Sequence, residues 1–373
     1  MKDVYVISDN IYSPLGKNTR ANMDSLKKGE TGIRRHPPGI FPEPFFASLL
    51  APEDKAADND LSAFEQVVLA SAMDAIKNSP LPPDIGGEKT GFILSSTKGN
   101  ISMVEGLGDK TIPEQNISLN TSAEKIAARL GVKTSPLVVS HACISGLLAM
   151  ITGMRLIRAG LFDTLIISGG DLITSFIYSG FASFQAISPN PCRPFDATRD
   201  GISLGEGAAT VILSSQPAPG AVRPLGGAVS NDANHISGPS RTGQELFMAV
   251  QSAMKQSGIS GRDIQFISAH GTATRYNDDM EAKAIHLASM ETVPVNSLKG
   301  YYGHTLGAAG ILESVITIHS MKENILLPTM GYSKPGTEMP VNVIKELQPA
   351  TLHTCLKTAS GFGGCNAALV LAV

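Results

Sequence analysis

Two segments far apart in the chain share one pattern of glycines, an alanine pair and an apolar run typical of a β-strand. They are Gly205-Glu-Gly-Ala-Ala-Thr-Val-Ile-Leu213 and Gly363-Gly-Cys-Asn-Ala-Ala-Leu-Val-Leu371. Each follows a similar order of strand, helix, strand and helix signals. The repeat favours a duplicated α/β unit, with a seam near residues 215–230 where proline and glycine cluster. A chain of 373 residues is long enough for two such units.

Alternating helix and strand signals indicate an α/β fold with layered helices. Ser62 and Glu65 form a capping box that predicts a helix over residues 62–78. The pattern Thr121-Ser-Ala-Glu124 predicts the start of another helix, and Gly131 predicts its end.

Composition excludes several classes of protein. Hydrophobic residues make up 42% of the chain and charged residues 17%, which excludes extended disorder. No basic run suggests nucleic acid as a ligand, and no apolar run of about 18 residues predicts a membrane span. The N-terminus lacks the apolar region of a signal peptide. The four cysteines lack paired motifs and metal-ligand spacing, so we expect free thiols in a reducing cytoplasm.

Cys143 lies between an apolar run at residues 137–139, which predicts a buried strand, and an apolar helix predicted over residues 144–159. The N-terminus of that helix favours a thiolate, and the turn from strand to helix presents the sulfur. A single cysteine is more often a small buried apolar residue. That structural interpretation is kept for the other three cysteines, Cys192, Cys355 and Cys365.

Two histidines follow predicted strands at the edge where α/β sheets bind ligands. His270 follows the apolar run 264–268 and begins His270-Gly-Thr-Ala-Thr274, and His304 precedes a helix of small residues. No HExxH motif or familiar carboxylate spacing accompanies them, so no metal is predicted. A papain-like protease would also need a cysteine and a histidine, but the residues around Cys143 do not match its signature. Four other histidines are interpreted as structural: His36, His286, His319 and His353.

Six motifs, in order along nearly the whole chain, resemble the β-ketoacyl-(acyl carrier protein) synthases of the thiolase fold. The motifs are Ser13-Pro-Leu-Gly16, Ala142-Cys143 with Ser145-Gly146, Arg193 to Ala208, His270 to Thr274 with Asp278 and Glu281, Lys299 to Gly310 with Glu313, and Gly361-Phe-Gly-Gly364. The resemblance implies an α/β, thiolase-like fold of two duplicated halves in five layers, α-β-α-β-α. Residues 1–220 would carry the nucleophile, and residues 221–373 the two histidines.

The Cys-His-His set resembles the elongating synthases, because chain-initiating relatives carry asparagine at one histidine position and thiolases use a second cysteine. The resemblance implies that Cys143 accepts an acyl group as a thioester. His270 and His304 would then stabilise the enolate formed when malonyl-acyl carrier protein loses CO₂. The product would be a β-ketoacyl-acyl carrier protein in fatty-acid, polyketide or polyene biosynthesis. No cofactor is implied, because the substrates travel on the phosphopantetheine arm of the carrier protein.

The resemblance also assigns supporting residues. Thr272 and Thr274 would hydrogen-bond the phosphopantetheine arm. Lys299 and Glu313 would form a buried pair that positions the histidines, with a purely structural ion pair as the alternative. Asp278 would give structural support.

Two departures from the family bear on the substrate. Elongating synthases read Phe-Gly-Phe-Gly-Gly near the end, where the first aromatic residue gates the acyl pocket. This chain has Ser360 at that position and retains Phe362. The amides of Cys143 and Ser360 would hold the second oxyanion.

The stretch between Leu94 and Asn120 is also shorter than is typical of the family. Because of these two departures, a polyene or aryl acyl chain is as well supported as ordinary fatty-acid elongation.

The expected partners are acyl carrier protein and a second synthase subunit, either identical or related. A second functional hypothesis is a non-catalytic subunit that shapes the pocket of a paired synthase, like a chain length factor. The presence of Cys143, His270 and His304 argues against it, because a subunit without chemistry does not need them.

Overall fold

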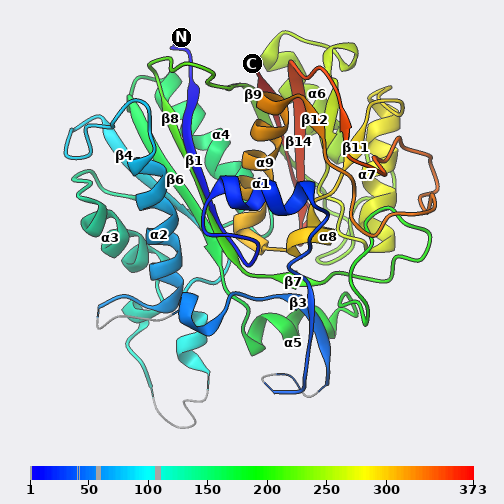
Figure 1. Cartoon of the computed structure of the whole chain (residues 1–373), viewed down its shortest axis with the longest axis horizontal. Helices are drawn as coiled ribbons and strands as arrows, with labels where there is room; N and C mark the ends of the chain where they lie inside the picture. The colour runs from blue at the N-terminus through cyan, green and yellow to red at the C-terminus, as the bar shows by residue number, and fades with distance from the viewer. Residues whose placement is uncertain (1, 40, 42, 56–59, 106–110) are drawn as a thin grey trace.

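The computed structural model describes residues 2–39, 41, 43–55, 60–105 and 111–373. Two five-stranded sheets stand side by side with helices between and outside them (Figure 1). The first sheet has the order β1-β8-β6-β4-β5: β1 (Tyr5–Tyr12), β8 (Gly207–Ser214), β6 (Thr164–Asp171), β4 (Thr90–Ser95) and β5 (Leu137–Val139). The second has the order β9-β15-β14-β10-β11: β9 (Arg223–Asn231), β15 (Cys365–Ala372), β14 (Thr354–Gly361), β10 (Phe266–Ser268) and β11 (Val295–Asn296).

The two sheets have the same strand directions, position by position. In the first, β8 is antiparallel to both β1 and β6, and β4 is parallel to β6 and β5. In the second, β15 is antiparallel to β9 and β14, and β10 is parallel to β14 and β11. The two repeated segments of the sequence therefore fall on β8 and β15, which occupy equivalent places. The predicted duplication is confirmed.

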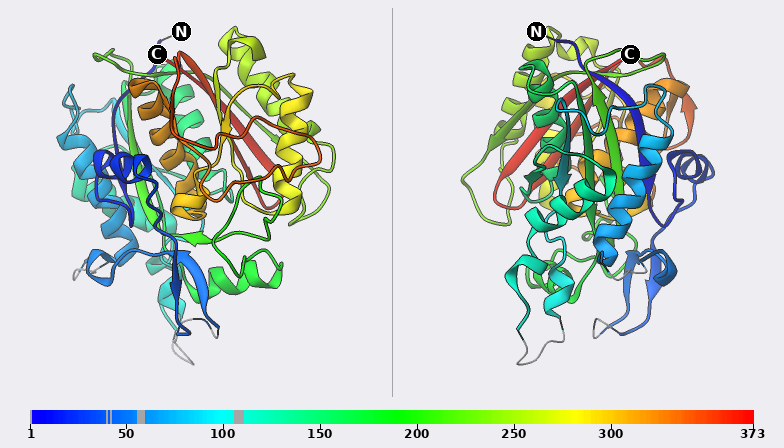
Figure 2. Two further views of the ribbon diagram at one scale, coloured as in Figure 1. Left: turned by 45° about the vertical axis from the view of Figure 1, so that its right-hand side comes forward. Right: turned by 90° about the vertical axis from the view of Figure 1, so that its left-hand side faces the viewer.

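Helices complete five layers. The central layer holds α4 (Ser145–Arg158) and α9 (Ala309–Glu323), which contact each other and both sheets (Figures 1 and 2). The outer layers hold α2 (Ala63–Lys77) and α3 (Leu119–Leu130) on the first sheet, and α6 (Gln244–Ser257) and α7 (Arg275–Leu287) on the second. The predicted α-β-α-β-α architecture of a thiolase-like fold is confirmed. Smaller elements are α1 (Thr19–Lys27), α5 (Ser175–Ser183), α8 (Lys299–Tyr302), β2 (Arg34–His36), β3 (Phe45–Ser48), β7 (Leu204–Gly205), β12 (Ile325–Leu326) and β13 (Gln348–Pro349).

Two glycines let α4 and α9 approach closely enough to form the central layer. A Cβ added at Gly310 would lie 2.2 Å from the Leu147 amide nitrogen, and one at Gly146 would lie 2.8 Å from the Gly307 carbonyl oxygen. Larger residues would separate the helices, because real Cβ atoms do not approach backbone atoms so closely. This contact brings the start of α4 next to the segment that carries His304.

Several local predictions can be compared with the structure. The capping box of Ser62 and Glu65 is present, and Gly131 ends α3 in the left-handed conformation with φ of 84°. The capping box predicted at residues 121–124 is wrong, because α3 already begins at Leu119 behind Ser118. The prediction that strand 137–139 is buried is also wrong. It is the edge strand β5, and its backbone pairing is to β4 alone within the sheet.

No helix in the part of the chain that the structure describes combines the length and apolar character needed to span a bilayer. The four cysteines are free and buried.

Candidate active site

Cys143 lies in a tight turn directly before α4, as the sequence predicts. Ala142 has φ of 44°, a strained value for a residue with a side chain. The Ser145 hydroxyl holds the turn, accepting from the His141 amide at 2.7 Å and donating to the Ala142 carbonyl at 2.6 Å. The cysteine side chain thus faces the pocket at the start of a helix, in the manner of a nucleophile on a strained elbow.

The expectation of a lowered thiol pKa at Cys143 is wrong. Burial raises the pKa of Cys143 to about 12, and a smaller repulsive contribution comes from Cys365. Lys299 and the Phe362 amide oppose this rise without overcoming it. Position at a helix N-terminus favours the thiolate, but the loss of hydration outweighs it. The resting nucleophile is therefore a thiol.

We expect iodoacetamide to alkylate Cys143 at a rate that rises about tenfold per pH unit between about pH 7 and pH 10, because the thiolate fraction grows by that factor below the pKa. Mass spectrometry of the peptide that contains Cys143 measures the rate, and a Cys143→Ser variant gives the background from the other cysteines. A plateau beginning near neutral pH would show that the helix N-terminus controls this thiol after all.

His270 and His304 lie beside Cys143. The sulfur and one ring nitrogen of each histidine all lie within 4.8 Å of one another, and all three residues are buried. The two imidazole rings are nearly perpendicular, with centroids 5.2 Å apart. Cys143 follows β5 of the first sheet, whereas His270 follows β10 and His304 follows β11 and α8 of the second half, so the site draws on both sheets.

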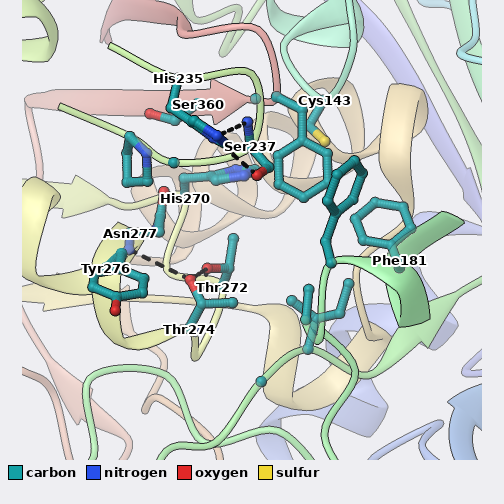
Figure 3. A pocket seen from close by; sticks show the side chains of 18 of the residues that line it. Cys143, Phe181, His235, Ser237, His270, Thr272, Thr274, Tyr276, Asn277 and Ser360 are labelled. Atoms are coloured by element: carbon teal, nitrogen blue, oxygen red, sulfur yellow. Dashed lines mark hydrogen bonds between the residues drawn. The ribbon is translucent and has the colours of Figure 1, made fainter.

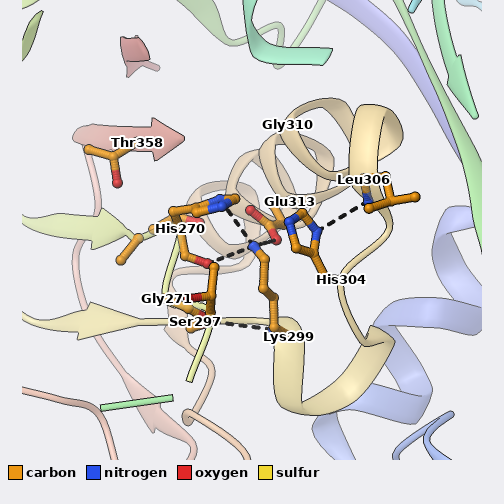
Figure 4. Close-up of polar contacts among 12 residues, drawn as sticks. His270, Gly271, Ser297, Lys299, His304, Leu306, Gly310, Glu313 and Thr358 are labelled. Atoms are coloured by element: carbon orange, nitrogen blue, oxygen red, sulfur yellow. Dashed lines mark hydrogen bonds and ion pairs between the residues drawn. The ribbon is translucent and has the colours of Figure 1, made fainter. Parts of the chain in front are cut away.

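Each histidine accepts a hydrogen bond at Nδ1 from a group that can only donate (Figure 4). The Lys299 ammonium lies 3.3 Å from Nδ1 of His270, and the Leu306 amide lies 3.1 Å from Nδ1 of His304. Burial is the largest cause that holds the pKa of both imidazoles well below 6.5, and the Lys299 charge adds to it. Both rings are therefore neutral with the proton on Nε2. Each presents one N–H donor, and neither Nε2 keeps a lone pair for a metal ion.

The Lys299–Glu313 pair is present and buried, and a second lysine joins it. Glu313 lies 2.7 Å from Lys299 and 2.7 Å from Lys357, and the side chains of both lysines are at most 1% exposed. Lys299 also donates to the His270 carbonyl at 2.6 Å. Sequence reasoning missed Lys357, although a lysine inside the apolar run of a predicted strand was a usable signal.

The carboxylates of α7 hold the backbone of the His270 loop. Glu281 accepts from the amides of His270 and Gly271 at 2.8 and 2.5 Å. Asp278 accepts from the amides of Thr272 and Phe195 at 2.9 and 2.7 Å, and burial raises its pKa to about 7.

Cys143, His270 and His304 line a pocket of about 590 Å³. Figure 3 shows Cys143 and His270 in this pocket. Thr272, Thr274, Ser360 and Phe362 also line it, so the structure brings these four residues together at one pocket. The pocket also has an aromatic wall that the sequence did not reveal. In that wall Phe362 lies 5.3 Å from Phe181 and 5.2 Å from Phe184, measured between ring centroids.

Two family domains match the chain in sequence order. The Beta-ketoacyl synthase N-terminal domain matches residues 43–218, and the Beta-ketoacyl synthase C-terminal domain matches residues 224–333. The chain belongs to the β-ketoacyl synthase family. It is therefore a condensing enzyme of the acyltransferase class, as the six motifs predict.

Relatives of this β-ketoacyl synthase match it over almost their full length. The chain is 28% identical to 3-oxoacyl-[acyl-carrier-protein] synthase 2 of Staphylococcus aureus strain N315, covering 99% of this chain and 98% of the relative. It is 26% identical to a chain of the complex between the ketosynthase ApeO and its chain length factor ApeC from Xenorhabdus doucetiae, with a TM-score of 0.84, and the match covers 100% of this chain and 98% of that one. A chain of the ishigamide ketosynthase/chain length factor structure is 25% identical with a TM-score of 0.91, and the match covers 100% of this chain and 99% of that one.

Proposed function

We propose that this synthase elongates an acyl chain by decarboxylative Claisen condensation of malonyl-acyl carrier protein with an acyl group held on Cys143. The observation that carries the proposal is the cluster of one thiol and two Nε2–H donors that lines one pocket. Incubation of the protein with acyl- and malonyl-carrier protein should yield β-ketoacyl-carrier protein and CO₂. Absence of both products with every acyl donor tried would refute the proposal.

In the first half-reaction, the sulfur of Cys143 attacks the acyl thioester on the carrier protein. The bond between the acyl carbon and the pantetheine sulfur breaks, and the proton of Cys143 ends on that sulfur. A proton must leave Cys143 during this step, because its raised pKa keeps it a thiol at rest. The backbone N–H of Phe362, which lowers the pKa of Cys143, supports the tetrahedral intermediate together with the amide of Cys143 itself.

This assignment differs from the role first expected for the Ser360 amide. Ser360 pairs with Asn366 in the β14–β15 ladder, and its hydroxyl donates to the Asn366 Oδ1 at 2.8 Å. The Phe362 amide lies two residues further along, beyond the end of β14, where the chain turns toward Cys143. We therefore place Phe362, and not Ser360, opposite Cys143 in the oxyanion site.

In the second half-reaction, the C–C bond to the malonyl carboxylate breaks and CO₂ leaves. The electron pair passes into an enolate whose oxygen accepts from the Nε2–H groups of His270 and His304. The enolate carbon then attacks the acyl carbonyl, the thioester bond to Cys143 breaks, and the sulfur regains a proton from solvent. Neutral donors fixed before the reaction stabilise the developing charge without reorganising.

The remaining residues have supporting roles in this proposal. The hydroxyls of Thr272 and Thr274, 2.9 Å apart on the pocket wall, bind the phosphopantetheine arm. Lys299 fixes the tautomer of His270, Glu313 fixes Lys299, and Asp278 supports the loop. No bound cofactor or metal enters the reaction.

We propose acyl carrier protein and a second synthase subunit as partners, because the Staphylococcus aureus relative is an acyl-carrier-protein synthase and the Xenorhabdus doucetiae ketosynthase forms a complex with a chain length factor. We also divide the chain at residues 220 and 221, between β8 and β9, because each sheet lies on one side of that point. The four free thiols support a location in a reducing cytoplasm.

The second candidate function is a non-catalytic subunit that shapes the pocket of a paired synthase. The intact cluster of Cys143, His270 and His304 disfavours it.

Ser360 should widen the acyl pocket. Its small side chain is buried on the pocket wall, at the position where the elongating synthases that the chain resembles carry a phenyl ring. We expect Ser360→Phe to lower kcat/KM for rigid conjugated or aryl acyl donors by about tenfold while sparing short saturated donors. Ser360→Ala, which removes only the hydrogen bond to Asn366, is the control. Equal losses across short, long and rigid donors would show that this position does not gate the pocket.

A further inference from the structure

Lys357 is a buried cation that the proposed reaction has not used. Its side chain is fully buried in β14, between the second sheet and α9. The ammonium group donates to the carbonyls of Ser268, Ala269 and Thr358 at 3.1, 3.2 and 2.8 Å and lies 2.7 Å from Glu313. A buried lysine is costly, so this set of partners needs an explanation beyond packing.

The contacts of Lys357 converge on His270. Two of its three carbonyl acceptors, those of Ser268 and Ala269, immediately precede His270 in the chain. Its carboxylate partner, Glu313, also holds Lys299, which in turn holds Nδ1 and the carbonyl of His270 (Figure 4). Lys357 therefore reaches the histidine by two routes, one through the backbone and one through the shared carboxylate.

Two carboxylates, Glu313 and Glu281, act on the buried Lys357 beside His270. Glu313 is one carboxylate shared by two lysines. Glu281 accepts hydrogen bonds from the backbone amides of His270 and Gly271. It also accepts from the side-chain amide of Asn277 and from the Thr358 hydroxyl. The titratable groups that face His270 are Lys357 from β14, Lys299 from α8, Glu313 from α9, Glu281 and Asp278 from α7, and the nearby His304 and Cys143.

We propose that Lys357 is a positioning residue for the decarboxylation step, an inference that rests on the proposed function. Its ammonium group fixes the end of β10 and shares Glu313 with Lys299, so that Nε2–H of His270 faces the enolate oxygen. The same positive charge opposes a second proton on the imidazole. After burial, the charges of Lys299, His304 and Lys357 all lower the pKa of His270. Protonation at Nδ1 would set that nitrogen against the Lys299 ammonium and break the contact that orients the ring.

The test compares Lys357→Met, which removes charge and hydrogen bonds, with Lys357→Gln, which removes the charge but keeps a donor. Malonyl-carrier protein decarboxylation should fall about tenfold in the Met variant and less in the Gln variant, a loss typical of a group behind the reacting residue. Acylation of Cys143 should change less than about twofold in both. The pKa of the His270 ring, followed by NMR, should rise in both variants, because both lack the cation.

Lys55→Met is the matched control, since Lys55 also pairs with a buried carboxylate, that of Glu206 at 3.0 Å, outside this cluster. It should leave the ratio of the two half-reactions and the His270 pKa unchanged. Equal losses in both half-reactions with an unchanged His270 pKa would reduce Lys357 to a structural role and overturn the inference. If the Met variant does not fold, the Gln variant carries the same measurements. A wild-type protein without decarboxylation would refute the proposed function instead.

Discussion

Replacing Cys143 by alanine should abolish acyl-enzyme formation and condensation while the protein stays folded. The thiol donates no hydrogen bond on which the turn depends, since Ser145 holds the backbone there. Loss of a nucleophile removes the covalent route entirely, so condensation should fall to the uncatalysed background. Circular dichroism and melting temperature check the fold, and product formation from acyl- and malonyl-carrier protein measures activity.

The glutamine variant separates the two half-reactions. Cys143→Gln places a carbonyl group near the position of the acyl-thioester carbonyl, and it leaves His270 and His304 in place. We expect this variant to decarboxylate malonyl-carrier protein without condensing it. Condensation at the normal rate in either Cys143 variant would remove this residue from the mechanism, and loss of folding in both would leave Cys143→Ser as the working substitution.

His270→Ala and His304→Ala should each slow malonyl decarboxylation by about 10²–10³-fold, the loss usual for one oxyanion donor. Acylation of Cys143 should suffer less, because the negative charge in that step is held by the amides of Cys143 and Phe362. Since the pKa of both imidazoles lies well below 6.5, their protonation should not change the rate above about that pH.

His319→Ala is a suitable control for the histidine variants. His319 lies on α9, outside the pocket lining, and its Nε2 is 2.9 Å from the Asp9 carboxylate on β1. Removing the His319 ring should leave the ratio of decarboxylation to acylation unchanged. If His270→Ala and His304→Ala acylate poorly but decarboxylate normally, the two histidines act in the first half-reaction and the proposed roles are reversed.

The duplication was predictable because it repeats in the residues themselves. Glycines and an alanine pair before an apolar run mark β8 and β15, and those strands occupy equivalent places in two sheets of the same topology. Cys143, His270 and His304 were predictable for a related reason. Each stands in a glycine-rich or small-residue segment at the end of a secondary-structure element, and such segments meet at one edge of the sheets.

Burial was harder to predict, because it depends on packing between distant segments. The sequence around Cys143 favours a low pKa, but the desolvation that raises it comes from the surrounding fold. The apolar run 137–139 resembles a buried strand, and only the sheet order shows it at an edge. The ion pair of Lys357 depends on the packing of α9 against β14. The ring contacts of Phe181 and Phe184 depend on α5 lying beside the turn after β14 that carries Phe362. No local sequence pattern encodes either contact.

The central claim is that the acyl chain is held on Cys143 before condensation. Its most direct test is mass spectrometry of the digested protein after brief incubation with acyl-carrier protein alone. We predict the acyl mass on the peptide that contains Cys143, and its disappearance with release of β-ketoacyl-carrier protein when malonyl-carrier protein is added. Product formation without acylation of Cys143, or with the acyl group on Cys192, Cys355 or Cys365, would contradict the account.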